Sequence, residues 1–311
     1  MISCTLVKGR VPLDSTTWPN FFIVGAVKCG TTTLYSKLKK HPQVFLPEMK
    51  EPHYFSSRLP PPENREEHCI GNTEAYLSLY AGAEEFTAVG DASPSYLWDE
   101  ESPQRIVERA PGAKIVMSLR DPVSRAYSQY WMDVLMGWQA LPFDQALKRD
   151  YASKTKGYWT SRLYVELGLY AKQVERYITT FGRDRVLVVM FEDLVRDSQR
   201  VLTEITEHIG VDALEFGDAE DDVVSRNAFR RPRFPRLYRM LSDPRARHLR
   251  HRLLPGGVRQ WLHHGSILYD TAKPAMDPAS RKFLQDIFEP DLCELEALLG
   301  RRMPELRKSW F

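Results

Sequence analysis

The stretch Phe21–Leu34, FFIVGAVKCGTTTL, decides how the rest of the chain is interpreted. Four apolar residues lead into Gly25; Lys28, Gly30 and three threonines follow before an amphipathic segment begins. This order predicts a buried strand, a phosphate-binding turn and a helix. The lysine precedes the second glycine, whereas the triphosphate-binding loop G-x-x-x-x-G-K-[ST] has it after that glycine. We therefore expect the turn to hold a phosphate other than the end of ATP.

Other apolar runs predict a parallel sheet around this strand. Lys114–Leu119, Arg185–Phe191 and Thr87–Gly90 have the composition of strands buried on both faces. Helical patterns lie between the strands, at Thr32–Lys40, Glu74–Tyr80, Pro103–Arg109, Pro122–Met136 and Tyr170–Phe181. The alternation predicts an α/β fold: a P-loop-like three-layer αβα arrangement with a central parallel β-sheet, plus a mostly helical C-terminal segment.

We interpret residues 1–311 as a single domain, with a nucleotide-binding α/β core over 20–210, a variable charged lid-like insertion over 211–265 and a helical segment over 266–311. The insertion has five carboxylates in Glu215–Asp222 and ten arginines in Arg226–Arg252. These blocks either screen one another on a partly solvated subdomain or form a lid whose arginines meet an anionic ligand. The pattern of Pro278–Leu299 predicts a helix broken at Pro290.

Composition limits the classes of function. The formal net charge of +2 gives no reason to expect nucleic-acid binding, and the charged fraction of 27% is ordinary for a globular protein. The cysteines are scattered, without a C-x-x-C pair or clustered histidines, which argues against a disulfide framework or a metal site; they are Cys4, Cys29, Cys69 and Cys293. The chain starts without an apolar targeting run and has no twenty-residue apolar stretch, so we expect a cytoplasmic protein without an integral membrane segment.

The turn after the first strand collects groups that bind an anion. Backbone N–H groups and the dipole of the following helix favour negative charge there. Gly25 and Gly30 allow close backbone approach, Lys28 adds a full positive charge, and the hydroxyls of Thr31, Thr32 and Thr33 add donors. The alternative is a turn capped by a threonine without any ligand.

At this point the sequence resembles a known family. FFIVGAVKCGTTTLYSKLKKHPQVFLPEMKEPHYFS, from Phe21 to Ser56, looks like the opening of sulfotransferases that use 3′-phosphoadenosine 5′-phosphosulfate (PAPS), especially the heparan-sulfate-sulfotransferase-like branch with its bacterial, biosynthetic relatives. In that family the loop embraces the 5′-phosphosulfate, and no magnesium is handled. The resemblance implies that PAPS is the co-substrate, that no metal is needed, and that residues 28–33, Cys29 included, line the nucleotide site.

A second segment supports the resemblance. KIVMSLRDPVSRAYSQYW, from Lys114 to Trp131, looks like the family's 3′-phosphate motif, in which an arginine ends a strand and a serine follows on a helix. Arg120 ends the expected strand, and Ser128 lies about two turns along a helix that Pro122 begins. A guanidinium and a hydroxyl at the carboxyl end of a parallel sheet suit a dianionic phosphate. The alternatives are a salt bridge for Arg120 and an ordinary surface position for Ser128.

Sulfuryl transfer needs a base for the acceptor and a cation for the leaving oxygen. Lys28 is the natural cation because the loop places it beside the 5′-phosphate. KEPHYF, from Lys50 to Phe55, matches the family's K-E-x-H-[FY]-F segment, whose glutamate is the base, so we assign that role to Glu51. His53 is the rival base, or it orients Glu51 or contacts the acceptor, and Lys50 contacts the acceptor or PAPS. The alternatives are a Lys50–Glu51 pair and a structural imidazole.

Two further expectations concern the segment DASPSY, through the resemblance, and Cys29, through its position at a helix start. DASPSY, from Asp91 to Tyr96, matches the family's [DE]-x-[ST]-P-x-Y segment near the acceptor, which makes Asp91 and Ser93 candidate acceptor contacts; turn formation at Ser93 is the alternative. Cys29 at a helix start should have a lowered thiol pKa, but we interpret it as a small residue that fills the loop, because the chemistry needs no nucleophile.

The chain departs from the family at the loop that closes on the nucleotide, because no K-G-R-like sequence is found. The candidates are Lys273 in TAKPAMD and the arginines of NAFRRPR, and we favour the latter, with Arg233.

The sequence therefore predicts a PAPS-dependent sulfotransferase acting on a hydroxyl, less favourably an amine, of a small-molecule, lipid or glycan acceptor. Two other functions stay open: a P-loop small-molecule kinase with a displaced lysine, and a non-catalytic nucleotide-binding or scaffold protein that uses its arginines. The sequence leaves the oligomeric state and the acceptor's identity open.

Overall fold

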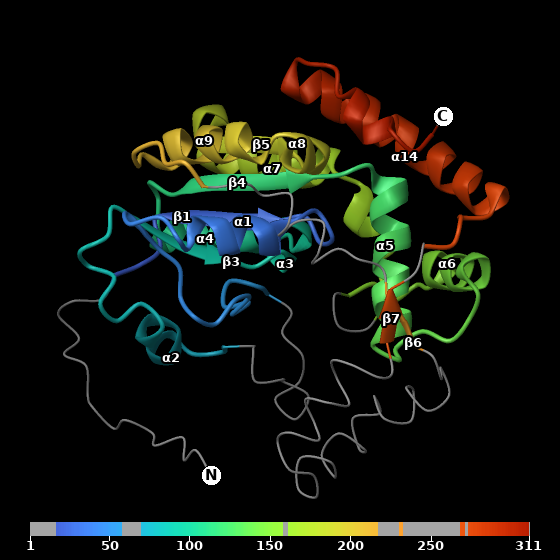
Figure 1. Cartoon of the computed structure of the whole chain (residues 1–311), viewed down its shortest axis with the longest axis horizontal. Helices are drawn as coiled ribbons and strands as arrows, with labels where there is room; N and C mark the ends of the chain where they lie inside the picture. The colour runs from blue at the N-terminus through green and yellow to red at the C-terminus, as the bar shows by residue number, and fades with distance from the viewer. Residues whose placement is uncertain are drawn as a thin grey trace, which may run out of the picture.

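A five-stranded parallel sheet forms the centre of the fold (Figure 1). The structure is a computed structural model and describes residues 17–57, 70–157, 161–216, 230–232, 268–270 and 273–310. The strands are in the order β2-β3-β1-β4-β5. Their bounds are β1 Phe21–Gly25, β2 Val44–Phe45, β3 Ala88–Ala92, β4 Lys114–Leu119 and β5 Val186–Met190. The predicted α/β fold with a central parallel sheet is confirmed.

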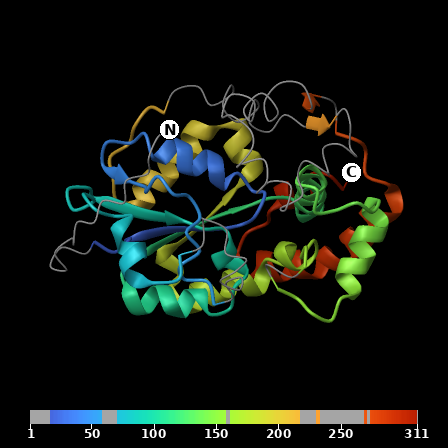
Figure 2. The same cartoon turned by 90° about the horizontal axis from the view of Figure 1, so that it is seen from below.

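Helices cover both faces of the sheet (Figure 2). On one face lie α1 (Thr31–Leu38), α8 (Phe191–Arg196) and α9 (Ser198–Ile209); on the other lie α2 (Thr73–Ser78), α3 (Ser95–Trp98), α4 (Ser102–Arg109) and α7 (Ala171–Phe181). Successive side chains of β1 alternate between the faces, since Phe21 and Ile23 pack with α1 and α9 whereas Phe22 and Val24 pack on the opposite side. This explains why β1 is apolar throughout.

Helix α5 (Pro122–Leu135) begins at the edge of the sheet where the strands' carboxyl ends lie, and it extends away from the sheet (Figure 1). A third apolar cluster joins α5 to α6 (Phe143–Ala152) and to the first half of α14 (Pro278–Leu299). Aromatic side chains supply much of this cluster, including Tyr127, Tyr130, Phe143 and Phe288.

The expectation that Pro290 breaks the last helix is wrong. Helix α14 is continuous from Pro278 to Leu299 with Pro290 inside it. Pro290 is exposed, so water can solvate the carbonyl group that loses its helical partner, while buried residues on both sides keep the helix on the protein; these are Leu284, Phe288, Leu292, Leu295 and Leu299.

The remaining elements are short, and most of the charged insertion lies outside the described residues. Strand β6 (Arg230–Pro232) pairs antiparallel with β7 (Leu268–Asp270). Short 3-10 turns are η2 (Glu166–Gly168), η3 (Arg183–Arg185) and η4 (Pro304–Arg307). The sequence had not indicated β2, α3, α6, α8 or α9, and the assignment of 211–265 as a separate insertion stays a prediction.

Candidate active site

The carboxyl ends of four neighbouring strands gather the candidate residues on one edge of the sheet. The loop after β1 contains Lys28, Arg120 follows β4, Ser93 follows β3 and Glu192 is the second residue after β5. Since β1 lies between β3 and β4, the loop is flanked by the segments that follow both strands. Open α/β sheets bind ligands in a crevice at this edge.

The loop after β1 is built to expose the start of helix α1. Gly30 is the N-cap residue with φ 82° and no side-chain capping bond, so the alternative of a threonine cap is wrong. A Cβ on Gly30 would lie 2.9 Å from the ring of Phe191, so both the backbone angle and the packing require glycine. The N–H groups of Thr33 and Leu34 donate to the Gly30 carbonyl oxygen at 2.9 and 3.1 Å, so those of Thr31 and Thr32, ahead of this first turn, are the ones available to an anion. Thr31 and Thr33 are buried and Thr32 is exposed.

Strand β4 fixes the position of this loop. The Ser118 hydroxyl donates to the Cys29 carbonyl oxygen at 2.6 Å, and the Ala26 N–H donates to the Ser118 carbonyl oxygen at 2.7 Å. The Arg120 guanidinium donates to the Lys28 carbonyl oxygen at 3.3 Å and lies over the Phe191 ring at 4.5 Å. Its Nε atom is buried and has no hydrogen-bond partner within the described part of the chain.

Three cationic side chains converge at this loop. Burial lowers the pKa of Lys28, and the charge of Arg120 lowers it further. Burial, followed by the charges of Arg120 and Lys28, lowers the pKa of Lys273 to about 7. The Lys273 ammonium also lies over the Tyr127 ring at 4.5 Å. Cations that disfavour one another's charge in this way are stabilised together by an anion.

The segment with Glu51 faces the same site in a strained backbone conformation. Lys28, Glu51 and His53 have φ values of 66°, 64° and 54°, which non-glycine residues rarely adopt. The Glu51 carboxylate accepts from Lys50 and lies 3.9 Å from Nε2 of His53. The expected alternative of a Lys50–Glu51 pair is therefore present, whereas the role of Glu51 as base stays a prediction.

A buried polar network supports this segment from below. Asp91 is fully buried and accepts from the hydroxyls of Tyr76 at 2.8 Å, Tyr96 at 2.9 Å and Ser93 at 2.7 Å. Ser93 in turn accepts from the backbone N–H of His53 at 3.3 Å. Burial raises the pKa of Asp91 to about 6, against the effect of these hydrogen bonds. Asp91 and Ser93, the predicted acceptor contacts, are both fully buried beneath the loop, and their contact with an acceptor stays a prediction.

His53 is held by the same network. It is 4% exposed, and its Nδ1 atom is 2.6 Å from the hydroxyl of Ser95, leaving Nε2 on the side of Glu51. Ser95 also contacts the Ser56 hydroxyl at 2.9 Å. The contact with Ser95 therefore orients the His53 imidazole so that Nε2 faces Glu51.

Cys29 corrects one expectation. Its thiol is fully buried, and burial raises its pKa to about 11 instead of lowering it. The desolvation of the thiolate therefore outweighs the start of the helix. The Tyr170 hydroxyl lies 3.9 Å from the sulfur, which is consistent with a packed loop residue.

Among the other predicted nucleotide contacts, the structure describes Ser128 and Lys273 but not Arg233. Ser128 lies on α5, eight residues after Arg120, and is half-buried. Arg233, the favoured closing residue, lies outside the described residues, whereas Lys273, the candidate not favoured, lies among the site's cations.

Two acidic residues near the loop were not singled out from the sequence. Burial raises the pKa of Asp133 to about 6, and its carboxylate accepts from the Tyr164 hydroxyl at 2.8 Å. The charge of Asp133 raises the pKa of Lys28, against the effect of burial. Burial raises the pKa of Glu192 to about 7, beside Arg120. The position of Glu192 after a strand end could have indicated it, whereas nothing local in the sequence marks Asp133.

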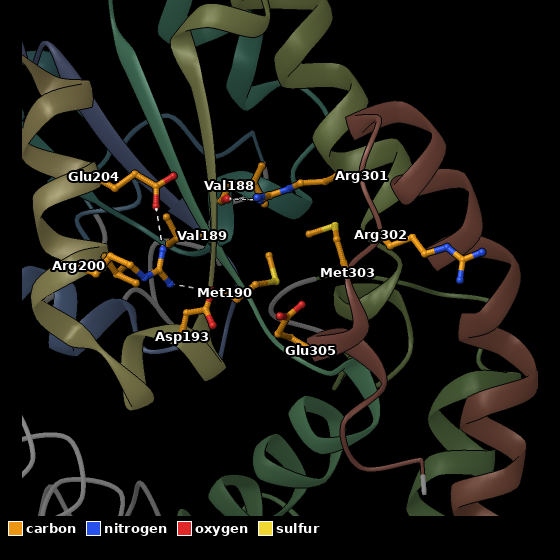
Figure 3. Close-up of a pocket in the computed structure, with 11 residues that line it drawn as sticks. Val188, Val189, Met190, Asp193, Arg200, Glu204, Arg301, Arg302, Met303 and Glu305 are labelled. Carbon is orange, nitrogen blue, oxygen red and sulfur yellow. Dashed lines mark hydrogen bonds and ion pairs between the residues drawn. The ribbon is translucent and has the colours of Figure 1, made fainter.

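Cavities within the described part of the chain also lie outside the loop itself. A cavity of about 690 Å³ between α5, α6 and α14 is lined by aromatic rings with polar groups among them; its lining includes Tyr127, Tyr130, Trp131, Phe143, Asp144 and Lys148. Because Lys273 covers the ring of Tyr127, this cavity adjoins the cationic site. A smaller cavity of about 180 Å³ lies along β5 between α9 and the segment after α14 (Figure 3).

Within the described ranges, the chain has neither a metal-ligand cluster nor a membrane-spanning helix. No group of three or more histidine, cysteine, aspartate or glutamate side chains there could hold a metal ion. No helix in those ranges combines the length and the apolar character needed to cross a bilayer.

Comparison with known proteins gives consistent matches. The model described as "Sulfotransferase family" matches residues 19–215. A sulfotransferase crystal structure from Alicyclobacillus acidocaldarius superposes with a TM-score of 0.70 at 30% identity, covering 94% of this chain and 99% of that one. The mouse bifunctional heparan sulfate N-deacetylase/N-sulfotransferase 4 is 27% identical over 94% of this chain and 31% of its own length.

A further mouse relative, heparan sulfate glucosamine 3-O-sulfotransferase 6, is 29% identical over 62% of this chain and 53% of its own length. The chain thus spans about a third to a half of these curated relatives.

Proposed function

Because the chain belongs to the sulfotransferase family, we propose that it transfers a sulfuryl group from PAPS to a hydroxyl, and less favourably an amine, of a small-molecule, lipid or glycan acceptor. The observation that carries this proposal is the convergence of Lys28, Arg120 and Lys273 on a helix start. A nucleotide with separate phosphates at its 5′ and 3′ positions supplies anions for all three.

The residues present fit PAPS. The N–H groups at the start of α1, Lys28 and the threonines would hold the 5′-phosphosulfate. Arg120, whose buried Nε lacks a partner within the described residues, would bind the 3′-phosphate together with Ser128. Lys273 supplies a further charge, and Arg233 stays a candidate. When bound, PAPS supplies the activated sulfuryl group.

In the proposed reaction, Glu51 takes the proton from the acceptor hydroxyl. The acceptor oxygen forms a bond to sulfur while the bond between sulfur and the 5′-phosphate oxygen breaks, and 3′-phosphoadenosine 5′-phosphate (PAP) leaves. Lys28 stabilises the charge that develops on the leaving oxygen, as in other in-line group transfers. His53 orients Glu51 from the opposite side to Lys50, and it is the alternative base.

For the acceptor, we propose a chemical class and not a specific compound. The relatives' names give heparan sulfate as their substrate, which favours a glycan among the three classes. The aromatic-lined cavity beside Lys273 would suit a sugar or aromatic ring. Screening acceptors with labelled PAPS would identify the compound, and a cytoplasmic location stays a prediction.

The role of Glu51 has a direct test. We expect Glu51→Gln to lower kcat by about 100-fold or more, as loss of a general base does, while the Kd for PAP changes little. Glu48→Gln is the matched control, because Glu48 lies in the same segment with a side chain 95% exposed. Full activity of Glu51→Gln would reject Glu51 as base, and a large loss in His53→Gln alone would transfer the role to His53.

The kinase alternative is tested by calorimetry. A sulfotransferase should bind PAP without magnesium, whereas a kinase should prefer ATP with magnesium. Loss of PAP binding in Lys28→Ala would also exclude the scaffold reading, which depends on the arginine-rich segment instead.

A further inference from the structure

The C-terminal segment Arg307–Trp310 is joined to the nucleotide side of the sheet by Asp121. Asp121 is 1% exposed and caps helix α5, where Oδ1 accepts the N–H groups of Val123 at 2.9 Å and Ser124 at 3.1 Å. Its other oxygen, Oδ2, accepts the N–H group of Ser309 at 2.7 Å. One buried carboxylate therefore connects the last described turn of the chain to the start of α5.

The residue before Asp121 is the proposed phosphate ligand Arg120. The Arg120 carbonyl oxygen accepts from the Tyr170 hydroxyl at 2.9 Å, and the guanidinium is held against the Lys28 carbonyl at 3.3 Å and the Phe191 ring. The direction of this guanidinium thus depends on how the Arg120–Asp121 peptide is fixed. Helix α5, which Asp121 caps, also carries Ser128.

The C-terminal segment has its own anchors and does not depend on Asp121 to stay in place. Arg307 pairs with Glu289 at 2.9 Å and with Glu296 at 2.8 Å, both on α14. The Arg281 guanidinium donates to the Ser309 carbonyl oxygen, and Leu306 is fully buried. The segment is therefore a firm support against which Asp121 is held.

We propose that Arg307–Trp310 is a positioning element for nucleotide binding: through the Ser309 N–H group and Asp121 it holds Arg120 and the start of α5 in the orientation that binds the 3′-phosphate. This rests on the proposed function, because it assumes that the anion at Arg120 belongs to PAPS or PAP. Linkage requires the effect to be mutual, so bound PAP must strengthen the contact between Ser309 and Asp121.

Asp121→Asn separates the two roles of this carboxylate. Asparagine keeps an oxygen for capping α5, but its amide nitrogen then faces the Ser309 N–H group, and two donors cannot bond. Asp197→Asn is the matched control, since Asp197 caps α9 through the Arg200 N–H group at 3.0 Å and does not contact the C-terminal segment. Arg281→Leu loosens the segment from its far side without touching Asp121.

We expect Asp121→Asn to raise the Kd for PAP and the KM for PAPS about tenfold, the scale of one hydrogen bond to a charged group. The kcat at saturating PAPS should stay within about twofold, because Glu51 and Lys28 are unchanged. Arg281→Leu should shift the same two constants in the same direction, and Asp197→Asn should shift neither. If Asp121→Asn fails to fold, Arg281→Leu carries the test.

The rate of hydrogen exchange at the Ser309 amide distinguishes coupling to PAP from a purely structural role, which would leave that rate independent of PAP. PAP should slow exchange of the Ser309 amide in the unchanged chain and have little effect on it in Asp121→Asn. Unchanged PAP affinity in Asp121→Asn and Arg281→Leu, or a Ser309 amide insensitive to PAP, would overturn the coupling while leaving the proposed function intact. An unchanged chain that binds no PAP would overturn both.

Discussion

At the scale of single residues, Lys273 is the group whose charge should respond most to the nucleotide. Its pKa is lowered to about 7, chiefly by burial and then by Arg120 and Lys28, so it is mostly neutral at pH 8 in the free protein. A bound phosphate favours the charged form and raises that pKa. We therefore expect PAP binding at pH 8 to take up protons, and to take up fewer at pH 6, where Lys273 is already charged.

Calorimetric heats of PAP binding in buffers of different ionisation enthalpy would count these protons. Glu192, with a pKa raised to about 7 beside Arg120, should act in the same direction, so Lys273→Met should reduce the uptake without abolishing it. Lys282→Met is the control, because Lys282 is 71% exposed on α14. Equal uptake in the unchanged chain and in Lys273→Met would contradict this assignment.

At the residue level, the sequence indicates which side chains lie together best where they are close along the chain. Lys28, Gly30 and the threonines fall within one turn, so their order along the chain already indicates their grouping in space. Lys273 and Asp133 join that group only because α5 and the segment before α14 pack beside the loop. No short pattern records such packing, so the sequence gives no reason to place Lys273 in this group, whereas the three arginines of NAFRRPR favour Arg233, which lies outside the described residues.

At the scale of elements, β5 is the last strand on one side of the described sheet, and an arginine side chain bonds to its outward-facing backbone. The Arg301 guanidinium donates to the outward carbonyl of Val188 at 2.9 Å, and charged side chains flank the strand on both sides (Figure 3). Unpaired edge groups invite pairing with another chain, and charges oppose it. Arg301 thus protects the edge of the sheet.

We expect Arg301→Ala to lower the free energy of unfolding by about 1 kcal/mol, the value of one hydrogen bond, and to increase concentration-dependent aggregation. Light scattering at rising protein concentration and denaturant melts would measure the two effects. Arg302→Ala, at the exposed arginine next in the chain, is the control. Identical scattering by the two variants would show that β5 needs no such protection.

Element prediction depended on how strongly a segment's own pattern marks its environment. β1 and β5 are apolar throughout and β4 is mostly apolar, because helices cover both faces of the sheet, so their runs are recognisable in the sequence. β2 has two residues, too few for any pattern. In α14 the local rule for Pro290 failed because packing of the helix on α7 and α5 outweighs the loss of one hydrogen bond.

At the scale of the whole molecule, the buried charges give stability an unusual dependence on pH. Burial raises the pKa of Asp91, Asp133 and Asp291 from 3.8 to about 6. Such a carboxyl binds its proton more tightly in the folded chain, so the free energy of unfolding falls as pH rises from about 4 to about 6. Lys273 acts in the opposite sense, because its lowered pKa makes the unfolded chain bind the proton more tightly between about 7 and 10.5.

The two effects together predict a shallow minimum of stability near pH 7 in the nucleotide-free protein, with the free energy of unfolding rising toward pH 5.5 and toward pH 9. Urea melts across this range would show it. Lys273→Met should flatten the alkaline rise while leaving the acidic side unchanged, because the three carboxyls are untouched, and Lys282→Met should alter neither. A free energy of unfolding that climbs steadily from pH 5.5 to pH 7 would mean that these buried carboxyls do not hold their protons more tightly in the folded chain.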